Sequence, residues 1–504
     1  MLKRYIQENR KSIFITVVFT VALYAVMLLG NRISIDTEVM INNPEGQLNA
    51  WYGINRFGLG LFKHVFHLIP ISIPFTNVMT VLFFIFAAIS WNYSLVTLQK
   101  VQNTKAVFVF LLIFVSSPIF AEQFHFTLQS MEIAFALGAE AIAVILVSRW
   151  VEKKGIYHAI AAVLLLAFCF SCYQAFVFLY VFACLLLYLI RQEEKETSGK
   201  EQVEEIFKYI LVLLAAFVLY EAAATAIKAS MGLESGKYLT NQILWGQEPV
   251  LYTLCRVIAY TGFIMTGFMS SFHPFLPVLY LFFAVVLYKK WQKKGGQSFL
   301  KLASLAGLMI VPFILPAVMG NTVPIRAQFC IPILLSWLGY FFVKSNEKGK
   351  IFRYARICVI LMLVLQTIAV PALELSAWRC YEKDKAFAKE VEAAAGDIQP
   401  EEKLVFVGKY TPNHMIKGQT MGHSFFEWDA DTAFGSNYRI HGFMETLGIK
   451  YQLPTQQEYE QARQYAENYL PGRRRKRYIP KTDCVSLSCL IEKRRIGIAF
   501  FKKL

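Results

Sequence analysis

The stretch SIFITVVFTVALYAVMLLGNRISIDTEVM, residues 12–40, joins an uncharged apolar run to a segment with two carboxylates. The run before Asn31 is long enough to cross a bilayer as one helix, because about 20 apolar residues suffice. Asp36 and Glu38 follow shortly after the run ends. The acids therefore lie where the chain leaves the predicted membrane, and the rest of the sequence must explain what they do there.

The composition favours a membrane protein. The chain has 504 residues, of which 56% are hydrophobic and 17% are charged. Soluble domains carry about 25% charged residues, so this chain predicts an all-α polytopic membrane protein. The net charge of +16 comes from short basic clusters between the apolar runs, as the positive-inside rule expects of cytoplasmic loops. This distribution argues against nucleic-acid binding.

The apolar runs predict about eleven transmembrane helices. Residues 1–11 are basic and are expected in the cytoplasm. We interpret residues 250–271 as a re-entrant or interfacial segment, because a further span there would place the basic KKWQKK (289–294) outside. The predicted spans are about 12–30, 74–95, 106–121, 129–149, 156–171, 174–190, 206–228, 274–289, 299–318, 328–343 and 354–373.

These spans form a membrane domain, residues 12–374, whose first outside loop is residues 31–73. Residues 375–504 are more polar and predict a small extracytoplasmic α/β domain. A charged helix is expected at 382–396, closed by Gly396, and T-x-x-E at Thr455 predicts a capping box. The predicted strands are KLVFVG (403–408), CVSLSCLI (484–491) and RIGIAFF (495–501).

The first outside loop carries the strongest functional pattern. LNAWYGINRFGLGLFKHVFH (48–67) places Arg56, Lys63 and His67 on one stripe of a helical wheel, which predicts an interfacial amphipathic helix with a basic face. Arg56 and Lys63 are candidates for holding a lipid phosphate. Asp36 or Glu38 is the candidate base for an attacking hydroxyl.

Other outside turns add weaker candidates. Arg326 lies in the turn GNTVPIRAQF as a second candidate for phosphate, and Glu122 with His125 is a candidate acid or metal ligand. Gln174 follows Tyr173 at a tight turn between two spans. The sequence has no G-x-x-x-x-G-K-[ST] loop and no G-x-S-x-G elbow, which disfavours an ATPase or a serine hydrolase.

Two motifs resemble a known family. SIDTE (34–38) and W-x-x-x-x-R-F-G-L-G, Trp51 to Gly60, are similar to the bacterial Gtr type II glucosyltransferases, which are grouped with the GT-C enzymes. The resemblance extends loosely over residues 12–375. It implies transfer of a hexose, usually glucose, from a polyprenyl-phosphate carrier to a surface glycan at the outer face of the bacterial cytoplasmic membrane.

The resemblance also implies roles for particular residues. An acid in the first outside loop serves as base or metal ligand, which here is Asp36 with Glu38 as the alternative. Family members more often show a paired acid, so the Asp-Thr-Glu order leaves both open. Arg56 would assist the carrier phosphate. Gln174 and Arg326 are candidates from topology alone.

Our working hypothesis is a polyprenyl-phosphate-sugar-dependent glycosyltransferase whose partners are the lipid-linked donor, a glycan acceptor and the bilayer. The sequence leaves open a divalent metal, Mg or Mn, at Asp36 and Glu38, because acid beside phosphate is a usual setting for magnesium. Two rival hypotheses remain: a polymerase or ligase acting on lipid-linked glycans, and a non-enzymatic lipid or solute transporter.

Overall fold

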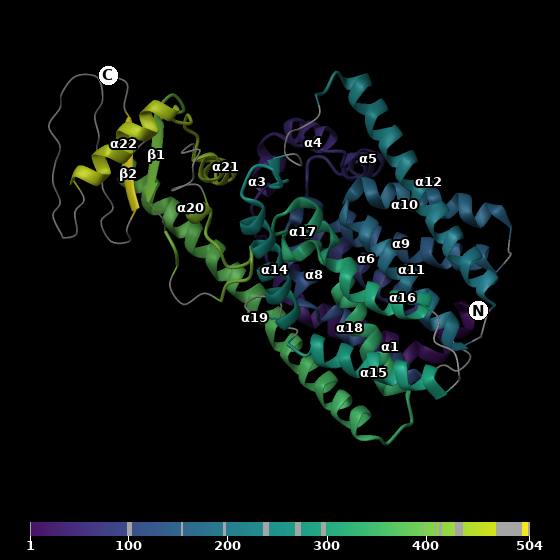
Figure 1. The fold of residues 1–504 in the computed structure, drawn as a ribbon. Coiled ribbons are helices and arrows are strands. Elements are labelled where there is room, and N and C mark those ends of the chain that lie inside the picture. Colours follow the sequence, from purple (N-terminus) through teal and green to yellow (C-terminus); the bar gives the residue numbers. More distant parts are fainter. Residues whose placement is uncertain are drawn as a thin grey trace. The chain divides into compact units, whose positions relative to one another are not determined.

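The computed structural model divides the chain into two compact units (Figure 1). Unit 1 comprises Met1–Leu29 and Leu48–Pro371, and unit 2 comprises Gly30–Gln47 and Ala372–Leu504. The short segment with the two acids therefore belongs to the same unit as the C-terminal region. The structure describes residues 2–97, 103–152, 155–194, 198–234, 241–267, 274–293, 299–396, 398–408, 410–412, 416–428, 437–469 and 496–501.

The named secondary-structure elements of unit 1 are all helices among its described residues. Besides the helices of the first loop, it contains α1 (Leu2–Leu23), α2 (Ala25–Leu29), α6 (Ile73–Val96), α7 (Thr104–Val115), α8 (Pro118–Phe124), α9 (Thr127–Val151), α10 (Ile156–Cys172), α11 (Ala175–Glu194), α12 (Gly199–Met231), α14 (Val250–Thr266), α15 (Leu276–Lys293), α16 (Phe299–Ile310), η1 (Val311–Phe313), α17 (Ile314–Met319), η2 (Ile325–Ala327), α18 (Cys330–Lys344) and the first part of α19 (Lys350–Ala395).

The described helices confirm a polytopic membrane protein. Six are long and apolar enough to cross a membrane, and α7 with α8, bent by 44° at their junction, would make a seventh. The helices α10, α14 and α18 are apolar but shorter. The count of about eleven spans thus stays a prediction, as does the re-entrant path of residues 250–271. The six are Ile73–Val96, Thr127–Val151, Ala175–Glu194, Gly199–Met231, Phe299–Met319 and Lys350–Ala395.

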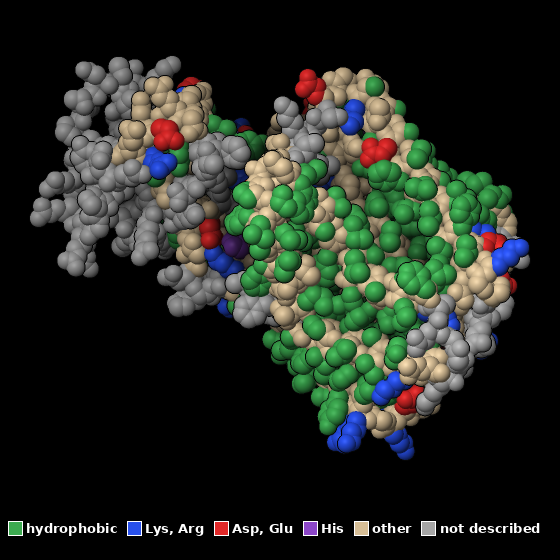
Figure 2. All heavy atoms as spheres, in the orientation of Figure 1, with side chains coloured by type: hydrophobic (Ala, Val, Ile, Leu, Met, Phe, Trp, Pro, Cys, Tyr) green, Lys and Arg blue, Asp and Glu red, His purple; other side chains and the backbone are tan. Residues whose placement is uncertain are grey.

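Close packing of α6 on α9 forms the centre of unit 1. Gly138 on α9 permits this approach, because a Cβ there would lie 2.6 Å from the ring of Phe86. The outside of unit 1 is apolar instead of polar: Val218, Ile258 and Ile368 are each more than 60% exposed. Figure 2 shows hydrophobic side chains over most of the visible face of this helical unit. Such an extensive apolar surface suits contact with lipid.

The first loop departs from the single helix expected over residues 48–67. The chain forms α4 (Pro44–Gly53) and α5 (Phe57–Val65), with a break between them. The break occurs at Asn55, whose φ of 63° lies in the left-handed region that ends helices. A single helical wheel therefore does not describe this segment, and its predicted basic face is divided between two helices.

Unit 2 combines helices with one small sheet. The strand β1 (Lys403–Gly408) pairs antiparallel with β2 (Ile496–Phe501), in a register that places Lys403 opposite Phe501. Both strands were expected from the sequence, whereas the one expected at 484–491 lies outside the described residues. The helices of unit 2 are α3 (Thr37–Asn42), α20 (Phe425–Trp428), α21 (Tyr438–Thr446), α22 (Gln456–Tyr469) and the second part of α19.

The predicted capping box at the start of α22 is confirmed. The Thr455 hydroxyl accepts from the backbone N–H of Glu458 at 3.3 Å, and the Glu458 carboxylate accepts from the backbone N–H of Thr455 at 2.7 Å. The two helices expected at about 354–373 and 382–396 are instead one continuous helix, α19. The intervening residues contain no glycine or proline to interrupt it, and α19 ends before Gly396, whose φ is 74°.

Candidate active site

The acid segment enters α3 through an unusual backbone conformation. Asp36 is the N-cap residue of α3, but its φ of 69° is left-handed and its side chain makes no capping hydrogen bond. Aspartate tolerates this conformation better than most residues do. Ser34 and Thr37 stabilise the turn through a hydroxyl contact of 3.0 Å. Because the Asp36 carboxylate does not cap the helix, it is available to other groups.

An arginine from the C-terminal region meets this carboxylate. Nη1 of Arg439, on α21, forms an ion pair with Oδ1 of Asp36 and lies 3.8 Å from Oε1 of Glu38. The side chains of Arg439 and Asp36 are 31% and 38% exposed, whereas that of Glu38 is 1% exposed. One guanidinium thus faces two carboxylates, of which one is open to solvent and the other is buried.

Glu38 differs from Asp36 in its electrostatic surroundings. Neither carboxylate oxygen of Glu38 has a hydrogen-bond partner among the described residues. Burial and, after it, the charge of Asp36 raise the pKa of Glu38 from 4.5 to about 8, although Arg439 opposes both effects. Glu38 therefore holds a proton at neutral pH, which makes Asp36 the stronger candidate for the base.

The helix α21 packs closely against α3 at this point. The Asn42 amide donates to the carbonyl oxygen of Gly442 at 2.9 Å. A Cβ at Gly442 would lie 2.8 Å from Cγ of Glu38, so a larger residue would displace the acid. A second ion pair, between buried Arg32 and Glu374, ties the acid segment to α19 within the same unit. These contacts explain why residues 30–47 form one unit with the C-terminal region.

Arg56 and Gln174, two candidates from the sequence, are brought together in unit 1. Nε of Arg56 donates to Oε1 of Gln174 at 3.2 Å, and its guanidinium lies 4.7 Å from the ring centroid of Tyr173. The Gln174 amide also donates to the carbonyl of Ile54 at 2.9 Å and to the hydroxyl of Tyr220 at 3.3 Å. Gln174 therefore orients Arg56 while its amide is held by the backbone of Ile54 and the hydroxyl of Tyr220.

Close packing explains why the R-F-G-L-G motif has glycine at both positions 58 and 60. A Cβ at Gly58 would lie 2.3 Å from Oγ of Ser171, so only glycine lets α5 approach α10. A Cβ at Gly60 would lie 2.5 Å from the hydroxyl of Tyr52. The motif thus fixes α5 against its neighbours and places Arg56 at the start of that helix.

Lys63 lies in a different environment from the one its sequence suggests. Its ammonium pairs with the carboxylate of Glu132 at 2.7 Å, both side chains are 0% exposed, and the ring of Trp51 lies 5.9 Å away. This placement does not fit a basic interfacial face or contact with a lipid head group. The helical wheel grouped Lys63 with Arg56, but the interior of unit 1 lies on the side where Lys63 points.

Arg326 forms a second arginine site in unit 1. It lies in η2, its guanidinium is 3.9 Å from the ring centroid of Phe126, and its Nε has no hydrogen-bond partner among the described residues. Three residues later, Phe329 contacts the Tyr173 ring at a centroid distance of 5.8 Å. Tyr173 thus contacts both Arg56 and Phe329, which follows the segment that carries Arg326.

Glu122 and His125, expected in an outside turn, are both buried. Glu122 lies in the last turns of α8 and is 1% exposed, while His125 is the C-cap residue of that helix and is 7% exposed. The helix α8 packs against η2, so these residues lie near the segment of Arg326. Because both side chains are buried, we expect Glu122 and His125 to support the segment of Arg326 structurally rather than to contact the substrate from solvent.

The described residues do not offer a ready metal site. Among them, no group of three or more His, Cys, Asp or Glu side chains is placed to hold a metal ion. At the acid centre, a guanidinium already occupies the position beside Asp36 that a cation would take. The pair Asp36 and Glu38 therefore does not fit the metal that the sequence left open.

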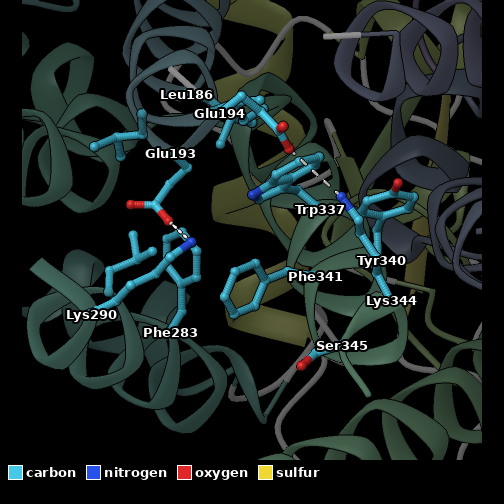
Figure 3. Close-up of a pocket in the computed structure, with 13 residues that line it drawn as sticks. Leu186, Glu193, Glu194, Phe283, Lys290, Trp337, Tyr340, Phe341, Lys344 and Ser345 are labelled. Carbon is cyan, nitrogen blue, oxygen red and sulfur yellow. Dashed lines mark hydrogen bonds and ion pairs between the residues drawn. The ribbon is translucent and has the colours of Figure 1, made fainter. Parts of the chain in front are cut away.

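A separate cavity of about 210 Å³ lies in unit 1 between α11, α15 and α18 (Figure 3). Aromatic rings form much of its wall, and two lysines line it. Lys290 pairs with Glu193, and Lys344 lies 3.9 Å from a carboxylate oxygen of Glu194. Because acids neutralise both lysines, this cavity is less suited to a phosphate than the segment around Arg326.

These features define a polytopic helical membrane protein with an acid centre in one unit and two arginine sites in the other. The model of the glucosyl transferase GtrII family matches residues 25–344. The chain belongs to this family, as its first-loop motifs suggested, and the family implies that it is a glucosyltransferase. No curated protein matches it.

Sequence reasoning missed Arg439. It lies 403 residues from Asp36 in the chain and outside the matched part of the family. The segment YRIHGFMET (438–446) shows only an amphipathic pattern, with Ile440, Phe443 and Met444 buried. No local signal distinguishes this arginine from the others in the basic C-terminal region.

Proposed function

We propose that the protein transfers glucose from a polyprenyl-phosphate carrier to a cell-surface glycan at the outer face of the bacterial cytoplasmic membrane, as a GT-C-type enzyme. In this topology the N-terminus is cytoplasmic and residues 375–504 are extracytoplasmic. The observation that carries the proposal is the half-exposed Asp36 carboxylate, which does not cap its helix and lies beside an acid whose pKa is raised to about 8. Such a pair separates an ionised base from a protonated neighbour.

The proposed reaction is a single displacement at the anomeric carbon of glucose. Asp36 accepts the proton of the acceptor hydroxyl, whose oxygen forms the new bond to the anomeric carbon. The bond between that carbon and the phosphate oxygen breaks, and polyprenyl phosphate leaves with the electron pair. Arg56 and Arg326 are assigned to the departing phosphate, because guanidinium groups bind phosphate through charge-assisted hydrogen bonds.

The surroundings of Arg56 and Arg326 favour these two residues over Lys63 as ligands of the donor phosphate. Arg56 contacts a neutral amide and an aromatic ring, and Arg326 contacts an aromatic ring. Neither of these contacts neutralises the guanidinium charge. Lys63, by contrast, is paired with Glu132 in the interior, so we assign it a structural role.

The donor can be tested with purified protein in detergent. Polyprenyl-phosphate glucose and a nucleotide-linked glucose, each radiolabelled, are supplied separately with an extracted surface glycan, with and without EDTA. The proposal predicts label in the glycan only from the lipid-linked donor and no loss with EDTA. Transfer from the nucleotide sugar would refute the donor, and growth of the glycan by whole repeating units would favour a polymerase. Movement of intact lipid-linked sugar without a product would favour a transporter.

A further inference from the structure

We propose that the C-terminal unit supplies a positioning residue to the acid centre: Arg439, whose guanidinium holds the Asp36 carboxylate in the orientation that receives the acceptor proton. The inference rests on the proposed role of Asp36 as the base. It extends the functional part of the chain beyond residues 25–344, which the family matches, to the region that follows α19.

The need for a positioning residue follows from the backbone at Asp36. A carboxylate at a helix N-cap is usually fixed by hydrogen bonds to the first turn, but Asp36 has none. The contact with Nη1 of Arg439 restrains it instead. A guanidinium is planar and always charged, so it can fix the plane of a carboxylate more firmly than an ammonium can.

Arg439 is itself held on a rigid element. It is the second residue of α21, directly after the N-cap region at Asn437. The Asn437 side chain is fully buried and bonds both ways to the β1 backbone: it accepts from the N–H of Phe406 at 2.6 Å and donates to its carbonyl at 2.9 Å. The start of α21 is thus pinned to the sheet, and Arg439 projects from a fixed point.

The same guanidinium also serves the second acid. Nη1 lies 3.8 Å from Oε1 of Glu38, which is buried and has no hydrogen bond of its own among the described residues. Two carboxylates two residues apart repel each other when both are ionised. At neutral pH Glu38 holds its proton and this repulsion is absent, whereas above its pKa of about 8 Glu38 is charged and Nη1 of Arg439 lies within reach of both acids.

The test uses native membranes from cells that produce the full chain, with incorporation of labelled glucose into glycan as the readout. This readout does not depend on which lipid carries the donor. The variants are Arg439→Ala, Arg439→Lys and Asp36→Asn. Arg463→Ala is the matched control, because Arg463 lies on α22 of the same unit, its side chain is 53% exposed and the acid near it, Glu460 at 4.0 Å, is exposed as well.

We expect Arg439→Ala to lower the rate by about 10- to 100-fold, because misplacing a catalytic group by about 1 Å has effects of that size. Added guanidinium ion, at concentrations too low to denature protein, should restore part of the rate in Arg439→Ala only. Arg439→Lys should lie between Arg439→Ala and the wild type. Arg463→Ala should stay within about twofold of the wild type, as exposed ion pairs contribute little.

Three outcomes would overturn the positioning role. A wild-type rate in Arg439→Ala would show that the contact is dispensable, and a faster rate would make it an inhibitory contact. If Arg439→Ala loses activity, and neither the Arg439→Lys substitution nor added guanidinium ion restores it, the role of Arg439 is purely structural. If Asp36→Asn is inactive while Arg439→Ala is not, only the positioning role fails. If Asp36→Asn keeps its activity, the proposed base fails as well.

Discussion

Among the ion pairs that join residues distant in the sequence, Lys63–Glu132 and Arg439–Asp36 have very different surroundings. Lys63 and Glu132 in unit 1 are both 0% exposed. Arg439 and Asp36 in unit 2 are 31% and 38% exposed. A fully buried ion pair stays together, because separating its members would leave unpaired charges in a medium of low dielectric constant. A half-exposed pair can exchange partners with a substrate, so the acid centre of unit 2 is the one suited to chemistry.

The same contrast separates two basic residues of the first loop. Arg56 and Lys63 occupy one predicted stripe, seven residues apart. In the structure, Arg56 lies at the start of α5 against Gln174, while Lys63 faces the interior of unit 1. Charge alone therefore does not identify a phosphate ligand in a membrane protein, and the neighbours of each cation decide its role.

The largest effect on stability is expected from breaking the buried ion pair between Lys63 and Glu132. Lys63→Met leaves the Glu132 carboxylate without its partner, which should cost about 3–5 kcal/mol and reduce the yield of monodisperse protein in detergent. The double variant Lys63→Met with Glu132→Leu removes both charges and should recover folded protein and glucose transfer. Size-exclusion profiles and thermal stability in detergent measure these changes.

This prediction can fail in an informative way. If Lys63→Met is as stable as the wild type but no longer binds the lipid-linked donor, Lys63 is a phosphate ligand and the comparison between the two pairs is wrong. The same conclusion follows if the double variant is stable but inactive.

A smaller effect, on kcat/KM for the donor, is expected from substituting Arg56 or Arg326. Arg56→Gln and Arg326→Gln should each lower kcat/KM for the donor by about 10- to 100-fold, since a charge-assisted hydrogen bond contributes about 1.5–3 kcal/mol. Both variants should fold normally, because neither arginine is paired with an acid in the contacts described above. Arg353→Gln, at an exposed position of α19, is the matched control. Unchanged kcat/KM in both variants would remove the assigned phosphate contacts.

The smallest effect concerns the proton on Glu38. Its pKa in the folded protein is about 8, above the ordinary value of 4.5, so ionisation opposes folding. The stability associated with the protonated acid is complete below pH 4.5 and is lost as the pH rises through 8. Glu38→Gln cannot ionise, so its melting temperature should exceed that of the wild type by an increasing margin from pH 6 to pH 9, reaching roughly 2–5 °C. Parallel melting curves would contradict the buried, protonated state.

The sequence predicted the features that depend on neighbouring residues. The capping box of Thr455 and Glu458 needs only a spacing of three, and the strand at 403–408 needs only a short apolar run. The first-loop motifs also indicated the family correctly. Two of their residues have a local explanation: Gly58 allows close packing, and Arg56 is the N-cap residue of α5, directly after the break at Asn55.

Features that depend on distant contacts could not be predicted. The pairing of Asp36 with Arg439 spans 403 residues, and that of Lys63 with Glu132 spans 69. Nothing in the local sequence tells which face of α5 turns inward. The continuity of α19 was missed for another reason: the change from apolar to charged residues marks a change of surroundings, and we interpreted it as the end of a helix.

The role of Asp36 as the base is tested most directly by the release of label from radiolabelled polyprenyl-phosphate glucose by purified wild-type protein and by Asp36→Asn, with acceptor glycan present. We expect steady turnover by the wild type and a rate lower by about 10²–10⁴ in the variant, the range expected for loss of a general base, with both proteins equally monodisperse. Equal turnover by the two proteins would show that Asp36 is not the base and would transfer this role to another acid.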